Sequence, residues 1–285
     1  MCEFRVQTNN LSSNLKSGFE YCWSKQLNLG NDFFKKPNLF DIWDFRSWQK
    51  IKDPNDILLE KVSKDHIGGV KLESGKISRT ERQWIQIEKS IRGETSPYVL
   101  KEELKEEMAS WKYPLNFIDF ETSTVPLPFF AGQKPYEQVA FQFSHHIYHK
   151  DGTIEHASEF ISTEPGVYPN FLFARALMEA LSKNNGSVFK FASHENTIVN
   201  AIIEQLIQSN EADKDELIVF LKSISHSKKN ITQETWKGER DMIDLCKVIK
   251  HFYYNPLTNG SNSIKKVLDI IRLFFSLPIF NNIKV

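Results

Sequence analysis

The pattern of hydrophobic and polar positions divides the chain near residue 110. Before this point, short apolar pieces alternate with clusters of Gly, Pro, Asn and Asp that are typical of turns. Two helices are predicted at the end of this part, one from Ser78 or Thr80 to about Ile91 and an acid-rich one over 101–111. Residues 1–110 are therefore predicted to form a mostly helical or irregular region.

From residue 113 onward, apolar runs of strand length alternate with segments of helical period. The predicted strands cover 115–121, 139–148, 153–161 and 187–191, and the predicted helices cover 170–181, 195–209, 214–225, 241–253 and 263–275. Three strands joined by hairpins, a helix, a fourth parallel strand and further helices make up the element order of an RNase H-like α/β fold. We predict a mixed sheet of this kind, flanked by helices, within residues 111–285.

Composition and charge exclude only a few classes of function. The 285 residues are 40% apolar and 13% aromatic, which indicates a globular protein rather than a disordered chain. Lys and Arg number 36, as do Asp and Glu, so the net charge does not indicate a nucleic-acid or membrane binder. From Lys222 to the end, however, eleven basic residues stand against five acidic ones, which points weakly to a polyanionic partner.

Several classes of protein lose support because their signals are missing. We find no secretory signal, and the most apolar stretch is shorter than the roughly 20 residues that cross a bilayer. Three cysteines are too few for a disulfide framework, so we expect a cytoplasmic protein with no membrane partner. No Walker loop, Gly-x-Ser-x-Gly or Gly-x-Gly-x-x-Gly motif is present, which argues against kinases, simple GTPases, esterases and classical dinucleotide enzymes.

The sharpest local feature is Asp119-Phe120-Glu121 at the end of the first predicted strand of the sheet. Side chains alternate along a strand, so Asp119 and Glu121 project from the same face. Two neighbouring carboxylates repel each other unless a divalent cation lies between them, and oxygen ligands suit Mg²⁺ or Mn²⁺. The alternative is that both acids are ordinary surface residues of a strand.

A second candidate, Glu195, lies where the fourth predicted strand passes into a helix. An acid there faces the strand ends and is stabilised by the helix dipole. Ser193 or Glu195 could equally serve as a simple helix cap. The segment is not a zinc-protease motif, because the residue four after His194 is Ile198.

A Gly/Ser/Asn loop near the C-terminus leads into a basic helix. Its Ser263, Lys265 and Lys266 could present backbone N–H groups and two ammonium groups to a phosphate of DNA or RNA. A capped helix with a solvated basic face explains the same residues. His145 and His146 are adjacent on a predicted strand and point to opposite faces, so we expect them to be structural, and we expect Cys246 to be a core residue.

Four motifs occur in an order that resembles a known bacterial family. They are 117–122, 135–144, 194–197, and 244–246 followed by 260–265. Together they closely resemble the family catalogued as domain of unknown function 2779, over about residues 113–268. That family looks like a divergent branch of the DEDD 3′–5′ exonucleases, which have an RNase H-like fold.

The resemblance implies a divalent-metal-dependent nuclease. Asp119 and Glu121 match the first exonuclease motif, and Glu195, in place of the usual Asp, stands near the second. These three acids would hold two Mg²⁺ or Mn²⁺ ions for hydrolysis of phosphodiester bonds at DNA or RNA ends. Asp244 is expected, from its place in the family pattern, to have a role in packing or at the start of a helix.

The sequence departs from the family pattern at both ends. Family members often carry a RecB-like nuclease region before this domain, and the segments around Cys2 and Cys22 look like its tail, so residues 1–110 are interpreted as its remnant or as a linker. Two cysteines cannot complete a four-thiolate cluster, so we expect no iron–sulfur cluster. The match stops after Leu268, and the segment that should supply the last catalytic Asp is missing. We therefore interpret 111–285 as a C-terminally incomplete domain.

Three functional interpretations remain open. In the first, the chain is a nuclease-like domain with little or no turnover, because one metal ligand is missing. In the second, it is a non-catalytic module that binds nucleic acid or a protein partner on the same fold. In the third, it is a poorly folding remnant.

Overall fold

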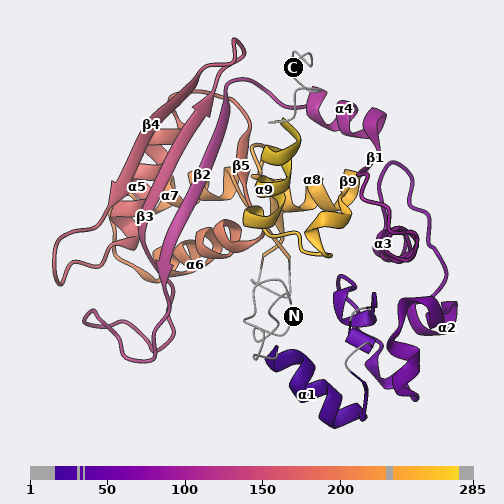
Figure 1. Ribbon diagram of the computed structural model, residues 1–285. Helices are drawn as coiled ribbons and strands as arrows, with labels where there is room; N and C mark the ends of the chain where they lie inside the picture. The colour runs from indigo at the N-terminus through magenta and orange to yellow at the C-terminus, as the bar shows by residue number, and fades with distance from the viewer. Residues whose placement is uncertain (1–16, 31–32, 35, 229–233, 276–285) are drawn as a thin grey trace. The chain divides into compact units, whose positions relative to one another are not determined.

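A mixed sheet organises the middle of the chain in the computed structural model (Figure 1). The structure describes residues 17–30, 33–34, 36–228 and 234–275. These residues divide into two units, one containing the chain up to Leu104 and from Val248 onward, and the other Lys105–Lys247. The predictions for Cys2 and for the segment after Phe275 lie outside the described residues.

Five strands form the sheet of the second unit, in the order β4-β3-β2-β5-β8. The first three are antiparallel neighbours, and β5 and β8 run parallel to β2. The strand bounds are β2 Leu115–Ser123, β3 Val139–Tyr148, β4 Ile154–Ile161, β5 Val188–Lys190 and β8 Ile243–Asp244. The carboxyl ends of β2, β5 and β8 therefore meet at one edge of the sheet.

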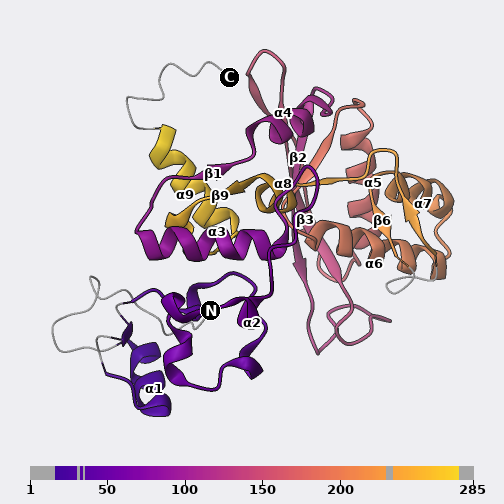
Figure 2. The ribbon, with the colours of Figure 1, turned by 90° about the vertical axis from the view of Figure 1, so that its right-hand side faces the viewer.

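Three helices pack on one face of this sheet (Figure 2). They are α5 Asn170–Leu181, α6 His194–Gln208 and α7 Lys214–Ser223. Ile118 and Phe120 of β2 alternate with Phe117 and Asp119, and only the first two enter the core that these helices cover. Burial of this apolar face fixes the register, because a shift by one residue would turn Ile118 and Phe120 to the wrong side.

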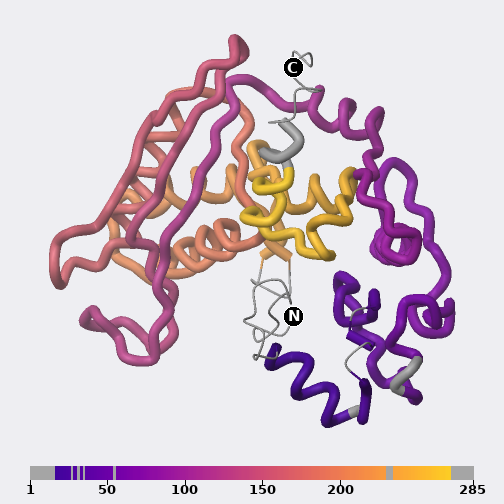
Figure 3. The backbone as a smooth tube through the Cα atoms, in the orientation of Figure 1, coloured from indigo at the N-terminus to yellow at the C-terminus, as the bar shows by residue number. Residues whose placement is uncertain are grey.

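The opposite face of β2 has its own aromatic contacts. Phe117 stacks on Phe189 of β5 at a centroid distance of 5.0 Å, and Trp111 packs edge-on against Phe189 at 4.8 Å. A long loop, 124–138, joins β2 to β3 and can be followed beyond the sheet in Figure 3. A short ribbon, β6 His226–Ser227 with β7 Trp236–Lys237, completes the second unit.

The first unit is built from helices and short turns. Its helices are α1 Gly18–Leu27, α2 Lys64–Ile67, α3 Arg79–Arg92 and α9 Ile264–Phe275, with 3₁₀ turns at Leu39–Asp41, Trp48–Lys50, Pro54–Ile57, Leu59–Lys61 and Pro256–Thr258. Strands β1 Tyr98–Val99 and β9 Tyr253–Tyr254 pair antiparallel. The divisions between the units fall within α4 Lys101–Ala109 and α8 Leu245–Phe252.

Arg82 of α3 holds the last part of the chain in the first unit. Its guanidinium donates to the carbonyl oxygens of Lys250 (3.3 Å) and Tyr253 (2.6 Å) and to Oδ1 of Asn262 (2.6 Å). Five donors in a fixed fork suit arginine to several acceptors at once. These bonds explain why residues from Val248 onward group with the N-terminal residues, whereas the sequence analysis kept 111–285 together.

The general α/β class and the mixed sheet with flanking helices are confirmed. The predicted helix over 241–253 was wrong at its start: Ile243 and Asp244 pair with β5, and the helix begins at Leu245. The Asp244 carboxylate accepts hydrogen bonds from the backbone N–H groups of Cys246 and Lys247, which is the geometry of a residue that precedes a helix. Within the described part of the chain, no helix is long and apolar enough to cross a membrane.

The histidine pair of β3 points to opposite faces, as predicted. His145 is buried and bonds to Oγ of Ser158 (2.9 Å) and Oδ1 of Asn116 (3.0 Å), and burial lowers its pKa to about 4. His146 is exposed. Cys246 is buried, as expected for a core residue.

Gly186 provides a test of the close approach between β2 and the start of β5. A Cβ at this position would lie 1.7 Å from the carbonyl oxygen of Pro114, so Gly186→Ala must push the two strands apart. We expect this substitution to lower the free energy of unfolding by at least about 2 kcal/mol. Urea unfolding followed by fluorescence measures the change. Gly69→Ala, where a Cβ has nothing within 4 Å, is the matched control. Equal losses of unfolding free energy in both variants would contradict the close approach of the two strands at Gly186.

Candidate functional site

The carboxyl edge formed by β2, β5 and β8 carries five charged side chains of the second unit. Asp119 and Glu121 come from β2, Lys190 ends β5, Asp244 ends β8, and Glu195 lies in the first turn of α6. In open α/β sheets, ligands bind outside the carboxyl ends of the strands. This edge is therefore the candidate site.

Asp119 and Glu121 share one face of β2, as the sequence predicted. Asp119 lies opposite Ser144 of β3 and Glu121 opposite Gln142, and both carboxylates are exposed. The register shifts between Glu121 and Thr122, so the strand is irregular immediately after the second acid. Such irregularities often redirect side chains beside active sites.

Glu195 is the buried acid of the site. Its residue is only 3% exposed, and Oε2 has no hydrogen-bond partner among the described residues. Burial raises the pKa of Glu195 to about 7; the positive charge of Lys190 opposes this shift, and the negative charges of Asp119 and Asp244 add to it. Asp119 thus lies within electrostatic reach of Glu195.

A hydrogen bond joins the end of β2 to the start of α6. Oγ1 of Thr122 lies 3.0 Å from Nε2 of His194, the residue before Glu195. The contact holds the first turn of α6 beside the acids of β2. It also gives His194, which the sequence left without a role, a positioning function at the site.

Lys190 and Asp244 form a buried ion pair that the sequence analysis missed. Lys190 is 2% exposed, and its Nζ lies 3.7 Å from Oδ2 of Asp244 and donates to the carbonyl oxygen of Ala192. Burial lowers the pKa of Lys190, and Asp244 and Glu195 counteract this effect. The only sequence signal was a lysine inside an apolar strand, because its partner is 54 positions further along the chain.

Asp244 connects three segments at this edge. Its Oδ1 accepts hydrogen bonds from the backbone N–H groups of Ala192 (3.0 Å), Cys246 (2.9 Å) and Lys247 (3.2 Å). The first bond fixes the loop that leads to α6, and the other two cap α8. Asp244 was expected to have a role in packing or at the start of a helix, and its bonds to Cys246 and Lys247 confirm the second of these.

The acids present fit a divalent cation only in part. Across the residues that the structure describes, no group of three or more His, Cys, Asp or Glu side chains is arranged to hold a metal ion. Asp244 is occupied by Lys190 and by three backbone N–H groups. What remains is the unpartnered Oε2 of Glu195 and the exposed carboxylates of Asp119 and Glu121, which are hard oxygen donors of the kind that Mg²⁺ and Mn²⁺ prefer.

Ser263, Lys265 and Lys266 belong to the first unit, at the start of α9. All three are exposed. The backbone N–H of Lys266 donates to Oγ of Ser263 at 3.4 Å, so the serine caps the helix. This local bond is what a capped helix with a solvated basic face requires, and the two lysines remain candidates for phosphate contacts.

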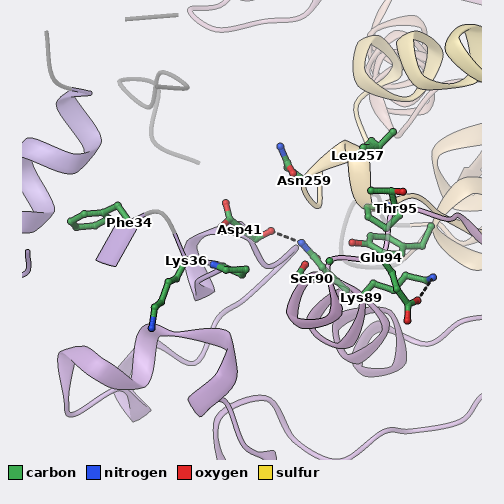
Figure 4. Close-up of a pocket in the computed structure, with 14 residues that line it drawn as sticks. Phe34, Lys36, Asp41, Lys89, Ser90, Glu94, Thr95, Leu257 and Asn259 are labelled. Carbon is green, nitrogen blue, oxygen red and sulfur yellow. Dashed lines mark hydrogen bonds and ion pairs between the residues drawn. The ribbon is translucent and has the colours of Figure 1, made fainter. Parts of the chain in front are cut away.

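A cavity of about 500 Å³ lies within the first unit, beside the end of α3 (Figure 4). Two lysines line it, and both are in ion pairs, Lys36 with Glu60 at 3.6 Å and Lys89 with Glu94 at 3.1 Å. An anionic ligand would have to displace these carboxylates. We therefore assign no function to the cavity.

Comparison with known proteins identifies the family. A protein-family model described as domain of unknown function DUF2779 matches residues 116–263. The chain belongs to this family. The match contains Asp119, Glu121, Glu195 and Asp244, so the candidate site lies within the DUF2779 region. No curated protein and no solved structure matches the chain.

Replacing each of the two lysines next to Asp244 tests the buried pair of the DUF2779 region. Lys190→Met leaves the Asp244 carboxylate buried without its countercharge, so we expect a loss of about 3–5 kcal/mol of unfolding free energy. Lys247 lies 4.0 Å from the same carboxylate but is mostly exposed, so Lys247→Met should cost less than about 1 kcal/mol. Thermal and urea unfolding would measure both, and similar losses would refute the special role of Lys190.

The raised pKa of Glu195 predicts a pH dependence of stability. Between the ordinary glutamate pKa and about 7, the unfolded chain has released this proton while the folded chain still holds it. The free energy of unfolding should therefore fall as pH rises through this window. Glu195→Gln removes the proton exchange, so its stability relative to wild type should improve by up to about 3 kcal/mol from pH 4.5 to pH 7.

The unfolding of Glu195→Gln and of wild type must be measured in EDTA, because a bound cation would stabilise the charged form of Glu195. Glu204→Gln, on the exposed side of the same helix, is the control. Urea unfolding at several pH values gives the difference between each variant and wild type. A constant difference for Glu195→Gln across the window would show that this carboxyl group is charged in the fold.

Proposed function

We propose that the DUF2779 region is a nuclease-like domain of RNase H-like fold that acts on DNA or RNA ends with the help of a divalent cation. The observation that carries the proposal is the buried, unpartnered Oε2 of Glu195, a carboxyl group whose pKa the negative charge of Asp119 helps to raise. A buried carboxylate oxygen without a partner is costly in a purely structural role. A cation or a protonated substrate group would satisfy it.

The strand arrangement supports the fold assignment. Three hairpin-joined strands are followed by α5 and by β5, which pairs parallel to β2. This is the element order that the DEDD resemblance implies, and β8 extends the sheet in parallel beside β5. The carboxylates stand at the edge where such a sheet would place its ligand site.

Asp119 and Glu195 would hold the cation, with Glu121 on the same face of β2 as Asp119. A bound Mg²⁺ or Mn²⁺ would supply Lewis-acid stabilisation of a phosphodiester oxygen. Thr122 and His194 position the start of α6, and Lys190 neutralises Asp244, which limits the site to fewer ligands than two cations require. We therefore propose slow turnover.

The loop between β2 and β3 offers a surface for unpaired bases. Phe129 and Tyr136 are 64% and 66% exposed, and the loop begins directly after the acids of β2. Tyr136 has a φ of 61°, a left-handed conformation that is strained for a bulky side chain. Exposed aromatic rings stack on bases of single strands regardless of sequence, which favours single-stranded ends as substrates.

A non-catalytic binding module is the second candidate function. The observation that favours it is the buried ammonium of Lys190, which supplies positive charge near Glu195 and Asp244 without a metal ion. Such a protein would keep the fold and the aromatic loop but cleave nothing. Its binding to nucleic acid would depend on salt and persist in EDTA.

The deciding experiment follows end-labelled single-stranded DNA and RNA in Mn²⁺ or Mg²⁺. We expect slow cation-dependent shortening that is lost in Asp119→Asn and Glu195→Gln, because each removes a ligand charge from the cation site. Glu179→Gln, an exposed acid on α5, should cleave like wild type. If folded wild-type protein cleaves nothing but binds single strands in EDTA, the binding module replaces the nuclease; if it does neither, both proposals fail.

A further inference from the structure

Two histidines face each other across the β3–β4 hairpin. His146 and His156 are direct register partners, and both are exposed. Nε2 of His146 lies 3.2 Å from Nδ1 of His156, and the ring centroids are 4.7 Å apart. The two side chains thus bring one ring nitrogen each to the same point above the sheet.

A carboxylate determines which nitrogen of His156 carries the proton. Oε2 of Glu159 lies 3.1 Å from Nε2 of His156, and an ionised carboxylate can only accept a hydrogen bond. Nε2 of a neutral His156 is therefore the donor, and Nδ1 presents its lone pair toward His146. Metal-binding histidines almost always donate their other ring N–H to a carboxylate, a backbone carbonyl or water, and Glu159 provides the first of these for His156.

The separation of the two facing nitrogens matches shared coordination of one ion. Zinc binds histidine nitrogen at about 2.0–2.1 Å in tetrahedral geometry, which places two ligand nitrogens about 3.3 Å apart. The observed 3.2 Å needs almost no movement of the backbone. Only the proton on Nε2 of His146 must shift to Nδ1, which is the ordinary exchange between the two neutral tautomers.

We propose that His146 and His156 bind a zinc ion, with Glu159 orienting His156 and water filling the other positions. The site is distinct from Asp119 and Glu195, whose oxygen ligands suit Mg²⁺ or Mn²⁺. The site has only two protein ligands. It is therefore consistent with the finding that, among the described residues, no group of three or more possible ligands is arranged to hold a metal ion. Affinity should be lower than that of a closed four-ligand zinc site.

The test is zinc titration of the full chain, with any histidine tag removed, by calorimetry at neutral pH. We expect one zinc per chain. Both His146→Gln and His156→Gln should weaken binding by at least about tenfold, and Glu159→Gln should weaken it by about 10–100-fold. NMR of the histidine rings in the wild-type protein should show zinc-dependent shifts at His146 and His156, which tests the assignment without any substitution.

Two controls separate this site from others. His149→Gln removes another histidine of the same hairpin, which pairs with Glu155 at 3.1 Å, and should leave zinc binding unchanged. Asp119→Asn removes only the attraction of a distant carboxylate and should weaken zinc binding by no more than about fivefold, so the outcome does not depend on the proposed nuclease. Millimolar Mg²⁺ should not compete. Absence of zinc binding, or binding that survives both His146→Gln and His156→Gln, would overturn the proposal.

Discussion

The buried pair of Lys190 and Asp244 is the interaction on which the candidate site depends. A single carboxylate fixes the loop before α6, caps α8 and neutralises the lysine at the end of β5. Because that loop leads directly into α6, its anchor also determines where Glu195 lies. An ion pair in such a buried position gives little net stability, but it enforces one arrangement of the segments that meet there.

The same pair limits what the edge can bind. A divalent cation is stabilised by uncompensated carboxylates, and Lys190 compensates the one that is nearest to it. In the absence of a cation the buried Glu195 holds its proton to about pH 7, so the exposed Asp119 and Glu121 carry the remaining negative charge of the site. Cation binding must therefore release this proton, so cation binding and pH are linked at the site.

Periodicity alone predicted most of the elements of the second unit, because the alternation of Ile118 and Phe120 with Asp119 and Glu121 directly reflects one buried face. The same alternation correctly placed both acids on the other face. β8 was missed because two residues, Ile243 and Asp244, are too short a segment to show a period.

Lys190 was missed for a different reason. Its burial is stable only because of a partner from another strand, and local sequence carries no information about such a partner. The unpartnered oxygen of Glu195 is likewise a property of the folded chain, since a first-turn glutamate in sequence resembles any other helix cap. Residue types alone were enough to select the candidate acids of the site. The buried ion pair and the unpartnered oxygen became visible only in the folded structure.

On the exposed side of the β2–β3–β4 sheet, a carboxylate and a histidine that could each bind a cation lie close to one another. Phe117 pairs with His146 and Asp119 with Ser144, so Asp119 and His146 occupy diagonal positions on one face. Diagonal neighbours on adjacent strands lie about 7–8 Å apart. A doubly charged ion at His146 would then attract the Asp119 carboxylate by about 1 kcal/mol before screening by salt. Zinc on the hairpin would thus reduce the affinity of Asp119 for a second cation, which couples the two sites through charge alone.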